Sequence, residues 1–198
     1  PSIHYDVYEA DFASLFPNIM VKRNISPETV CCDCCDNSRT PELDFSICEK
    51  QIGFIGKVLK PLVEDRQEMK EKVNDIEDEE RRRYVQGSID AIKWILVSCF
   101  GYQGFSNAKF GRIECHEAIN AFAREILLNA KAQLEAAGWR VVHGIVDSLW
   151  VTPREDVQQQ SLTDVAEAVT EQTQIRLEYE GEYDWIAFVP RRDSAAGA

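Results

Sequence analysis

The chain has 198 residues, of which 44% are apolar and 28% are charged, and its formal net charge is −12. This composition can bury a core and fits one domain with or without a protruding lobe. Because contacts to phosphates need clustered lysine and arginine, the acidity argues against a chain that grips nucleic acid by itself. No apolar run reaches the roughly 18 residues of a membrane span. We therefore expect no membrane association and, since no signal peptide opens the chain, an intracellular protein.

Residues 3–10 are apolar and β-prone, which predicts a strand that ends at Asp11. A short helix is expected over residues 15–20, broken at Pro17. Residues 31–52 combine cysteines, turn formers and charges without periodicity. This segment is expected to wrap the surface as an irregular insert.

Apolar positions at helical spacing predict one helix over residues 53–74 and a second over residues 81–100. An acidic turn joins them, so the two helices are expected to form an antiparallel hairpin. A short strand is expected over residues 108–113, and a third amphipathic helix over residues 115–137.

A β-hairpin is expected over residues 139–152, followed by a helix over residues 162–174 with Ser161 as its N-cap. Two further strands near 175–180 and 185–189 complete the predicted sheet. Helices mixed with antiparallel strands in this order predict an α+β fold with an inserted helical hairpin.

Two lone aspartates, Asp11 and Asp147, stand at the edges of predicted strands. Mg²⁺ prefers one or two protein carboxylates and completes its coordination with water and substrate phosphates. Paired sites of this kind suit phosphoryl and nucleotidyl transfer. An aspartate at a strand end is also a common turn former, so spacing alone leaves both interpretations open.

Seven cysteines are present, four of them in the run Cys31-Cys32-Asp33-Cys34-Cys35, with Cys48 close behind. In a chain that looks intracellular they indicate reduced thiols or a metal. A second C-x-x-C pair at zinc-finger distance is missing, so a zinc site lacks a clear fourth ligand.

Three segments carry a family resemblance. The sequence resembles motifs A, B and C of the family B DNA polymerases, in the family's order. Motif A matches residues 11–19 with residues 24–29, motif B matches residues 93–101, and motif C matches residues 143–148. The departures from the motifs are similar to those of the family's diverged archaeal branch. The resemblance thus implies a prokaryotic, archaeal, cytoplasmic DNA polymerase.

The resemblance also implies a domain plan. An antiparallel polymerase palm would be formed by residues 1–30 and 105–198, the latter carrying motif C. Residues 31–52 would be a cysteine-rich insert, and residues 53–104 the fingers hairpin, with motif B at its end. Exonuclease, N-terminal and thumb domains are not recognisable, which implies a piece of a larger polymerase. Its partners would be primer-template DNA, a deoxynucleoside triphosphate (dNTP) and the remaining domains.

In the family's terms, Asp11 and Asp147 would bridge two Mg²⁺ ions about 3.5–4 Å apart, with Mn²⁺ as a substitute. These ions activate the primer 3′-hydroxyl and steady the leaving pyrophosphate. The backbone amides of Ser14, Leu15 and Phe16 would cradle the triphosphate. The Phe16 ring, in place of the usual tyrosine, would block a ribose 2′-hydroxyl.

The resemblance assigns triphosphate binding to Arg66, Lys70 and Lys93, and Lys93 can also protonate the leaving group. Arg66 and Lys70 are four residues apart and so share a helix face. The alternative interpretation is that both only pair with neighbouring acidic residues on a solvated face.

Further expectations follow from the resemblance. Gly101, Arg191 and Arg192 would contact the duplex. The spacing of Cys34 and Cys48 is similar to that of a disulfide found in some archaeal relatives. A disulfide between them is therefore one of three alternatives, together with a zinc site and free thiols.

Four motif positions depart from the family pattern, namely Ile145, Val97, Phe16 and Phe100. Ile145 replaces the first aspartate of motif C. The first hypothesis is therefore a weak or specialised polymerase that uses two-metal nucleotidyl transfer. The second hypothesis is a non-catalytic scaffold or DNA-binding subunit. A zinc-bearing interaction module is the third hypothesis.

Overall fold

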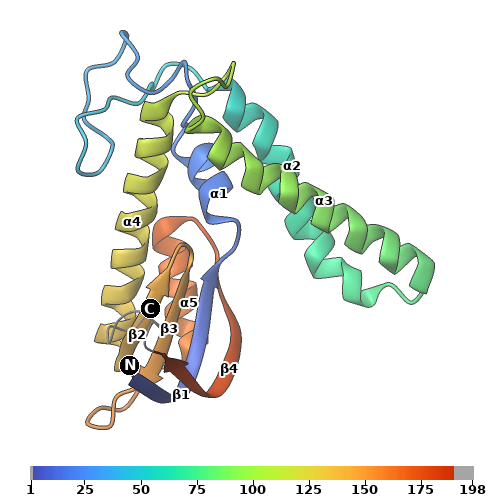
Figure 1. The fold of residues 1–198 in the computed structure, drawn as a ribbon, viewed down its shortest axis with the longest axis vertical. Coiled ribbons are helices and arrows are strands. Elements are labelled where there is room, and N and C mark those ends of the chain that lie inside the picture. The colour runs from blue at the N-terminus through green and yellow to red at the C-terminus, as the bar shows by residue number, and fades with distance from the viewer. Residues whose placement is uncertain (1, 190–198) are drawn as a thin grey trace. The chain divides into compact units, whose positions relative to one another are not determined.

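The structure, a computed structural model, describes residues 2–189 (Figure 1). The chain divides into two compact units. The first, here the sheet unit, is described over residues 2–13 and 125–189, and the second, here the hairpin unit, over residues 14–124.

The sheet unit contains a four-stranded antiparallel sheet in the order β2-β3-β1-β4. Its strands are β1 (Ser2–Phe12), β2 (Trp139–Ile145), β3 (Ser148–Pro153) and β4 (Leu177–Phe188). The central strand β1 pairs with both β3 and β4. Residues at its C-terminal end therefore meet residues from two distant parts of the chain.

Two helices supply the apolar layer behind this sheet (Figure 1). They are the C-terminal half of α4 (Ile113–Ala136) and the whole of α5 (Leu162–Thr173). A hydrogen bond from Gln133 Nε2 to Gln172 Oε1, 2.5 Å long, joins them. Their buried positions recur every four residues, which is the spacing of one helix face. The layer buries Ile126, Ala130, Leu134, Val165 and Val169, and the strands bury Phe12, Leu149, Val151 and Leu177.

The hairpin unit is helical. It contains α1 (Leu15–Lys22), α2 (Phe54–Lys72), the 3₁₀ turn η1 (Val73–Asp75) and α3 (Glu79–Gln103). The chain reverses at η1, so α2 and α3 run side by side in opposite directions (Figure 1). The Asp78 carboxylate accepts a hydrogen bond from Arg81 N at 2.7 Å and caps α3. None of the helices in the described part of the chain has the length and apolarity to cross a membrane.

Several sequence predictions are confirmed. The first strand, the β-hairpin and the helices expected over residues 53–74, 81–100, 115–137 and 162–174 all form with bounds close to those predicted. Ser161 occupies the N-cap position of α5, although its side chain makes no capping hydrogen bond.

Three predictions are wrong. Pro17 does not break α1, because it is in the first turn, where a missing N–H costs no intrahelical bond. Residues 108–112 form turns instead of a strand, with Ala108 N bonded to Phe105 O at 2.9 Å. The two strands expected after residue 175 are one continuous strand, β4, since pairing with β1 overrides the charged run between them.

Candidate active site

The structure brings Asp11 and Asp147 together within the sheet unit. Asp11 is near the end of β1, and Asp147 lies in the two-residue turn between β2 and β3. Asp11 is the register partner of Ser148, and Phe12 N donates a hydrogen bond to Asp147 O at 2.9 Å. Backbone pairing thus positions both aspartates at one end of the sheet.

The turn that carries Asp147 is strained. A two-residue hairpin turn needs positive φ angles, for which asparagine and glycine are preferred. Here Val146 has φ 57°, an unfavourable conformation for a β-branched side chain, and the side chain is 54% exposed. Core packing does not require valine there, so burial does not explain the strained conformation.

The carboxylate of Asp11 lies in a concentration of negative charge. Burial, together with the charges of Asp147, Glu180 and Glu9, raises the pKa of Asp11 to about 6. A hydrogen bond from Ser148 Oγ to Asp11 Oδ1, 2.5 Å long, acts in the opposite direction and lowers this pKa. A bound cation would relieve the repulsion among these carboxylates.

The residues present fit a magnesium site. Asp11 and Asp147 offer hard carboxylate oxygens, and Mg²⁺ binds through one or two carboxylates with the rest of its shell from water and phosphate. Burial, and to a smaller extent the neighbouring carboxylates, raise the pKa of Asp11, so its ionised form is less stable here than in water. A raised carboxyl pKa of this kind is common at functional sites, and a bound divalent ion would lower it.

Sequence reasoning missed three residues of this site. Ser148 follows Asp147 directly and could have been noticed as its neighbour. Glu9 is two residues before Asp11 on the same strand, so strand alternation puts both on one face. Glu180 gave no signal, because its approach depends on the pairing of β4 with β1.

In the hairpin unit, the structure joins two of the predicted nucleotide-binding residues. Arg66 Nη1 donates a hydrogen bond to Ser14 Oγ at 3.0 Å. Ser14 has φ 50° and precedes α1, whereas Leu15 is buried in its first turn. Lys70 lies one turn after Arg66 on α2 and, like it, is half-buried. Lys93 is exposed on α3.

Phe16 belongs to an aromatic stack that the sequence did not predict. Its ring lies on Phe100, with centroids 4.1 Å apart and an interplanar angle of 18°. Phe100 stacks in turn on His116 at 4.5 Å. The stack ties α1 to α3 and restricts the orientation of the Phe16 ring.

The predicted DNA contacts are only partly described. Gly101 is exposed in the last turn of α3. Arg191 and Arg192 lie outside the described residues.

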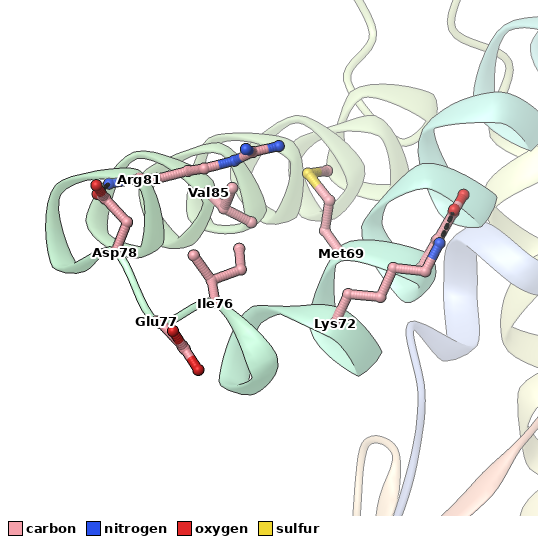
Figure 2. Close-up of a pocket in the computed structure, with 8 residues that line it drawn as sticks. Met69, Lys72, Ile76, Glu77, Asp78, Arg81 and Val85 are labelled. Atoms are coloured by element: carbon pink, nitrogen blue, oxygen red, sulfur yellow. Dashed lines mark hydrogen bonds and ion pairs between the residues drawn. The ribbon is translucent and has the colours of Figure 1, made fainter.

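A groove of about 510 Å³ lies at the far end of the α2–α3 hairpin (Figure 2). Met69, Ile76 and Val85 form its apolar floor, and charged side chains such as Lys72 and Arg81 rim it. It contains none of the predicted site residues.

Comparison with known proteins shows the family of the chain. The family model described as DNA polymerase family B matches residues 4–186. DNA polymerase 2 of Saccharolobus solfataricus is 41% identical over 194 residues, which cover 98% of this chain and 27% of that protein. DNA polymerase 1 of Pyrococcus abyssi is 29% identical over 196 residues, covering 96% of this chain and 25% of that protein.

A solved structure of the family B DNA polymerase from the hyperthermophilic archaeon Pyrobaculum calidifontis is similar in fold, with a TM-score of 0.76 at 29% identity. The match covers 93% of this chain and 24% of that one. The chain thus spans about a quarter of the length of the relatives it matches. Because the family model covers nearly the whole chain, the chain belongs to DNA polymerase family B.

Proposed function

We propose that this chain is the palm and fingers of a DNA-templated DNA polymerase that transfers dNMP from a dNTP to a primer 3′-hydroxyl. The observation that carries the proposal is the convergence of Asp11 and Asp147 at one end of the sheet, where the pKa of Asp11 is raised to about 6. The relatives are named DNA polymerases. The partners would be primer-template DNA, the dNTP and the remaining domains of the protein.

Asp11 and Asp147 would hold two Mg²⁺ ions, or Mn²⁺ in their place. When bound, such ions supply activation of the primer hydroxyl and charge stabilisation of the leaving pyrophosphate. Ser148 keeps Asp11 oriented and favours its ionised form through the 2.5 Å hydrogen bond. Near pH 7 the carboxylate is therefore mostly ionised and ready to act as a ligand.

The hairpin unit would bind the triphosphate. Arg66, Lys70 and Lys93 supply positive charge, and the backbone amides of Ser14, Leu15 and Phe16 lie at the start of α1, where N–H groups favour anions. The bond to Ser14 Oγ orients the Arg66 guanidinium beside these amides. Lys93 would donate a proton to the departing pyrophosphate.

Phe16 would select deoxyribose. A ring held by stacking on Phe100 cannot easily turn aside for a 2′-hydroxyl. A phenylalanine lacks the hydroxyl of the family's usual tyrosine, so selection would depend on ring position alone.

A second candidate, a non-catalytic scaffold or DNA-binding subunit, is favoured by two side chains. Ile145 stands where motif C of the family has its first aspartate, and it is 52% exposed. Val97 stands where motif B has an asparagine, and it is 55% exposed. Neither apolar side chain is explained by core packing.

Primer extension by the full-length protein, with Mg²⁺ and with Mn²⁺, tests the proposal. We expect extension that falls by on the order of 10²–10³-fold in Asp147→Asn. Asp164→Asn, an exposed carboxylate at the start of α5, is the matched control and should extend normally. Template binding without any extension, in either metal, would favour the scaffold instead.

A further inference from the structure

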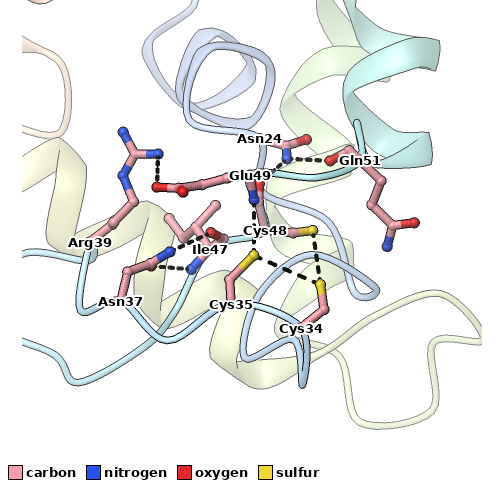
Figure 3. Close-up of polar contacts among 9 residues, drawn as sticks. All are labelled: Asn24, Cys34, Cys35, Asn37, Arg39, Ile47, Cys48, Glu49 and Gln51. Carbon is pink, nitrogen blue, oxygen red and sulfur yellow. Dashed lines mark hydrogen bonds and ion pairs between the residues drawn. The ribbon is translucent and has the colours of Figure 1, made fainter.

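Four cysteines of the hairpin unit converge. They belong to the segment of the chain that joins α1 to α2. Cys32, Cys34 and Cys35 come from one run, and Cys48 comes from the far end of the insert. Cys34 Sγ lies 3.5 Å from Cys48 Sγ, 3.7 Å from Cys32 Sγ and 3.8 Å from Cys35 Sγ. All four sulfur atoms lie within 4.8 Å of one another. Figure 3 shows Cys34, Cys35 and Cys48 turned toward a common point.

These separations match a tetrahedral thiolate site. With Zn–S bonds of about 2.3 Å, the edges of an S₄ tetrahedron are about 3.8 Å long. The three distances from Cys34 Sγ, 3.5, 3.7 and 3.8 Å, are close to that edge. A multinuclear iron–sulfur cluster places several metal atoms between its thiolates and so needs wider spacing.

A disulfide accounts for the arrangement less well. A disulfide bond is about 2.05 Å long, whereas the Cys34 and Cys48 sulfur atoms are 3.5 Å apart and both residues are free cysteines in the structure. A bond between these two would also leave Cys32 and Cys35 at the same point without a role. One zinc ion would be coordinated by all four cysteines.

The backbone around the cysteines is fixed by hydrogen bonds of the kind that support metal ligands. Glu49 N donates to Cys35 Sγ at 3.4 Å, and Cys48 N donates to Thr29 O at 2.8 Å. Asn24 Nδ2 donates to both Cys48 O and Gln51 O at 2.9 Å (Figure 3). The ligand-bearing segments are thereby held without any ion.

The insert has little regular secondary structure and few buried side chains. Residues 31–52 contain no helix or paired strand beyond one bridge, which joins Ile47 to Val30. Its buried side chains are few, chiefly Thr40, Ile47 and Cys48. In a segment with so small a core, a bound structural metal can supply much of the folding free energy.

We propose that Cys32, Cys34, Cys35 and Cys48 form a structural Zn²⁺ site in this polymerase. Binding would release the thiol protons to solvent and leave a closed tetrahedral centre with no open position for catalysis. The sequence left a zinc site without a clear fourth ligand, whereas in the structure three cysteines of the run lie beside Cys48 and the four can serve as ligands together.

The zinc site would stabilise the N-terminal end of α2. Asn24, which holds the Cys48 and Gln51 carbonyls, also accepts a hydrogen bond from Gly53 N at 2.8 Å, and Gly53 is the N-cap of α2. The same helix carries Arg66 and Lys70. The metal would thus stabilise the base of the helix proposed to bind the triphosphate.

The test is the zinc content of the full-length protein, purified with reductant and measured by mass spectrometry of the metal. Cys34→Ser and Cys48→Ser should each carry one equivalent of zinc fewer than the unmodified protein. Cys31→Ser is the matched control, because it removes a cysteine of the same run that is not one of the converging four, and it should keep its zinc. Equal zinc in all four proteins would overturn the proposal.

A second measurement does not depend on variants that fold. Adding Co²⁺ to unmodified protein stripped of zinc should give the visible absorption of a tetrahedral cobalt thiolate, and Zn²⁺ should abolish it. Absence of that spectrum would overturn the assignment. So would iron in place of zinc, or a Cys34–Cys48 cross-link found by peptide mapping of reductant-treated protein.

Discussion

Ser148 Oγ donates a hydrogen bond to Asp11 Oδ1 at 2.5 Å, across 137 positions of sequence. The bond joins the strand that ends at the first aspartate to the strand that follows the second. Since Ser148 adjoins Asp147, the same pairing sets the position of both carboxylates. Their convergence at one end of the sheet is the observation from which the metal proposal starts.

Asp11→Asn should stabilise the metal-free protein at pH 8 and lose that advantage by about pH 4. The folded pKa of about 6 lies above the ordinary 3.8, so ionisation of Asp11 destabilises the fold as pH rises through this interval. After allowance for solvent screening the gain at pH 8 is about 1 kcal/mol. Unfolding midpoints with EDTA between pH 4 and pH 8 measure it. An advantage that is the same at every pH would contradict this account.

Ile145→Asp should raise the extension rate of the full-length protein by about tenfold, or about 1.4 kcal/mol of barrier. A third carboxylate would strengthen metal binding against the charge of the triphosphate. Ile145 is 52% exposed, so the substitution removes little packing. Ile145→Asn, which is polar but uncharged, is the control for polarity. Equal rates in both variants would show that charge at this position is not limiting.

Arg66→Ala should raise KM for the dNTP by about 10- to 100-fold, because a hydrogen bond to a charged group contributes about 1.5–3 kcal/mol. Steady-state extension with varied dNTP measures this. Lys60→Ala removes an exposed lysine side chain from the same helix and should leave KM unchanged. If the two variants raise KM alike, Arg66 acts only through the net charge of α2.

Phe16→Ala should increase incorporation of ribonucleotides relative to deoxyribonucleotides by on the order of tenfold, since the ring that excludes the 2′-hydroxyl is lost. Competition between the two nucleotides at one template position gives the ratio. Phe105→Ala, which removes a ring that is 57% exposed outside the stack, provides the comparison. An unchanged ratio would mean that another group selects the sugar.

The local elements could be predicted because their patterns are local. Helical spacing fixed the expected ranges of α2 and α3, and the β-prone runs on either side of Asp147 predicted the β2–β3 hairpin. The continuity of β4 was missed, because its central residues are charged and only pairing with β1 keeps them extended.

The candidate sites were harder to predict than the elements. The sequence motifs selected Asp11 and Asp147. Nothing near Asp11 in the sequence indicated the hydrogen bond from Ser148, or that the charge of Glu180 raises the pKa of Asp11. Likewise, the cysteine run contained two overlapping C-x-x-C pairs, and only the folded insert shows that Cys32, Cys34 and Cys35 turn to Cys48. Both sites depend on contacts between distant residues.

The central claim is that Asp11 and Asp147 are metal ligands, and Mn²⁺ binding tests it most directly. Electron paramagnetic resonance of free Mn²⁺ counts the ions bound by the full-length protein with primer-template and an unreactive dNTP analogue. We predict that Asp11→Asn and Asp147→Asn each bind fewer tight Mn²⁺ ions than the unmodified protein, whereas Asp164→Asn binds as many. Equal binding by all four proteins would contradict the account.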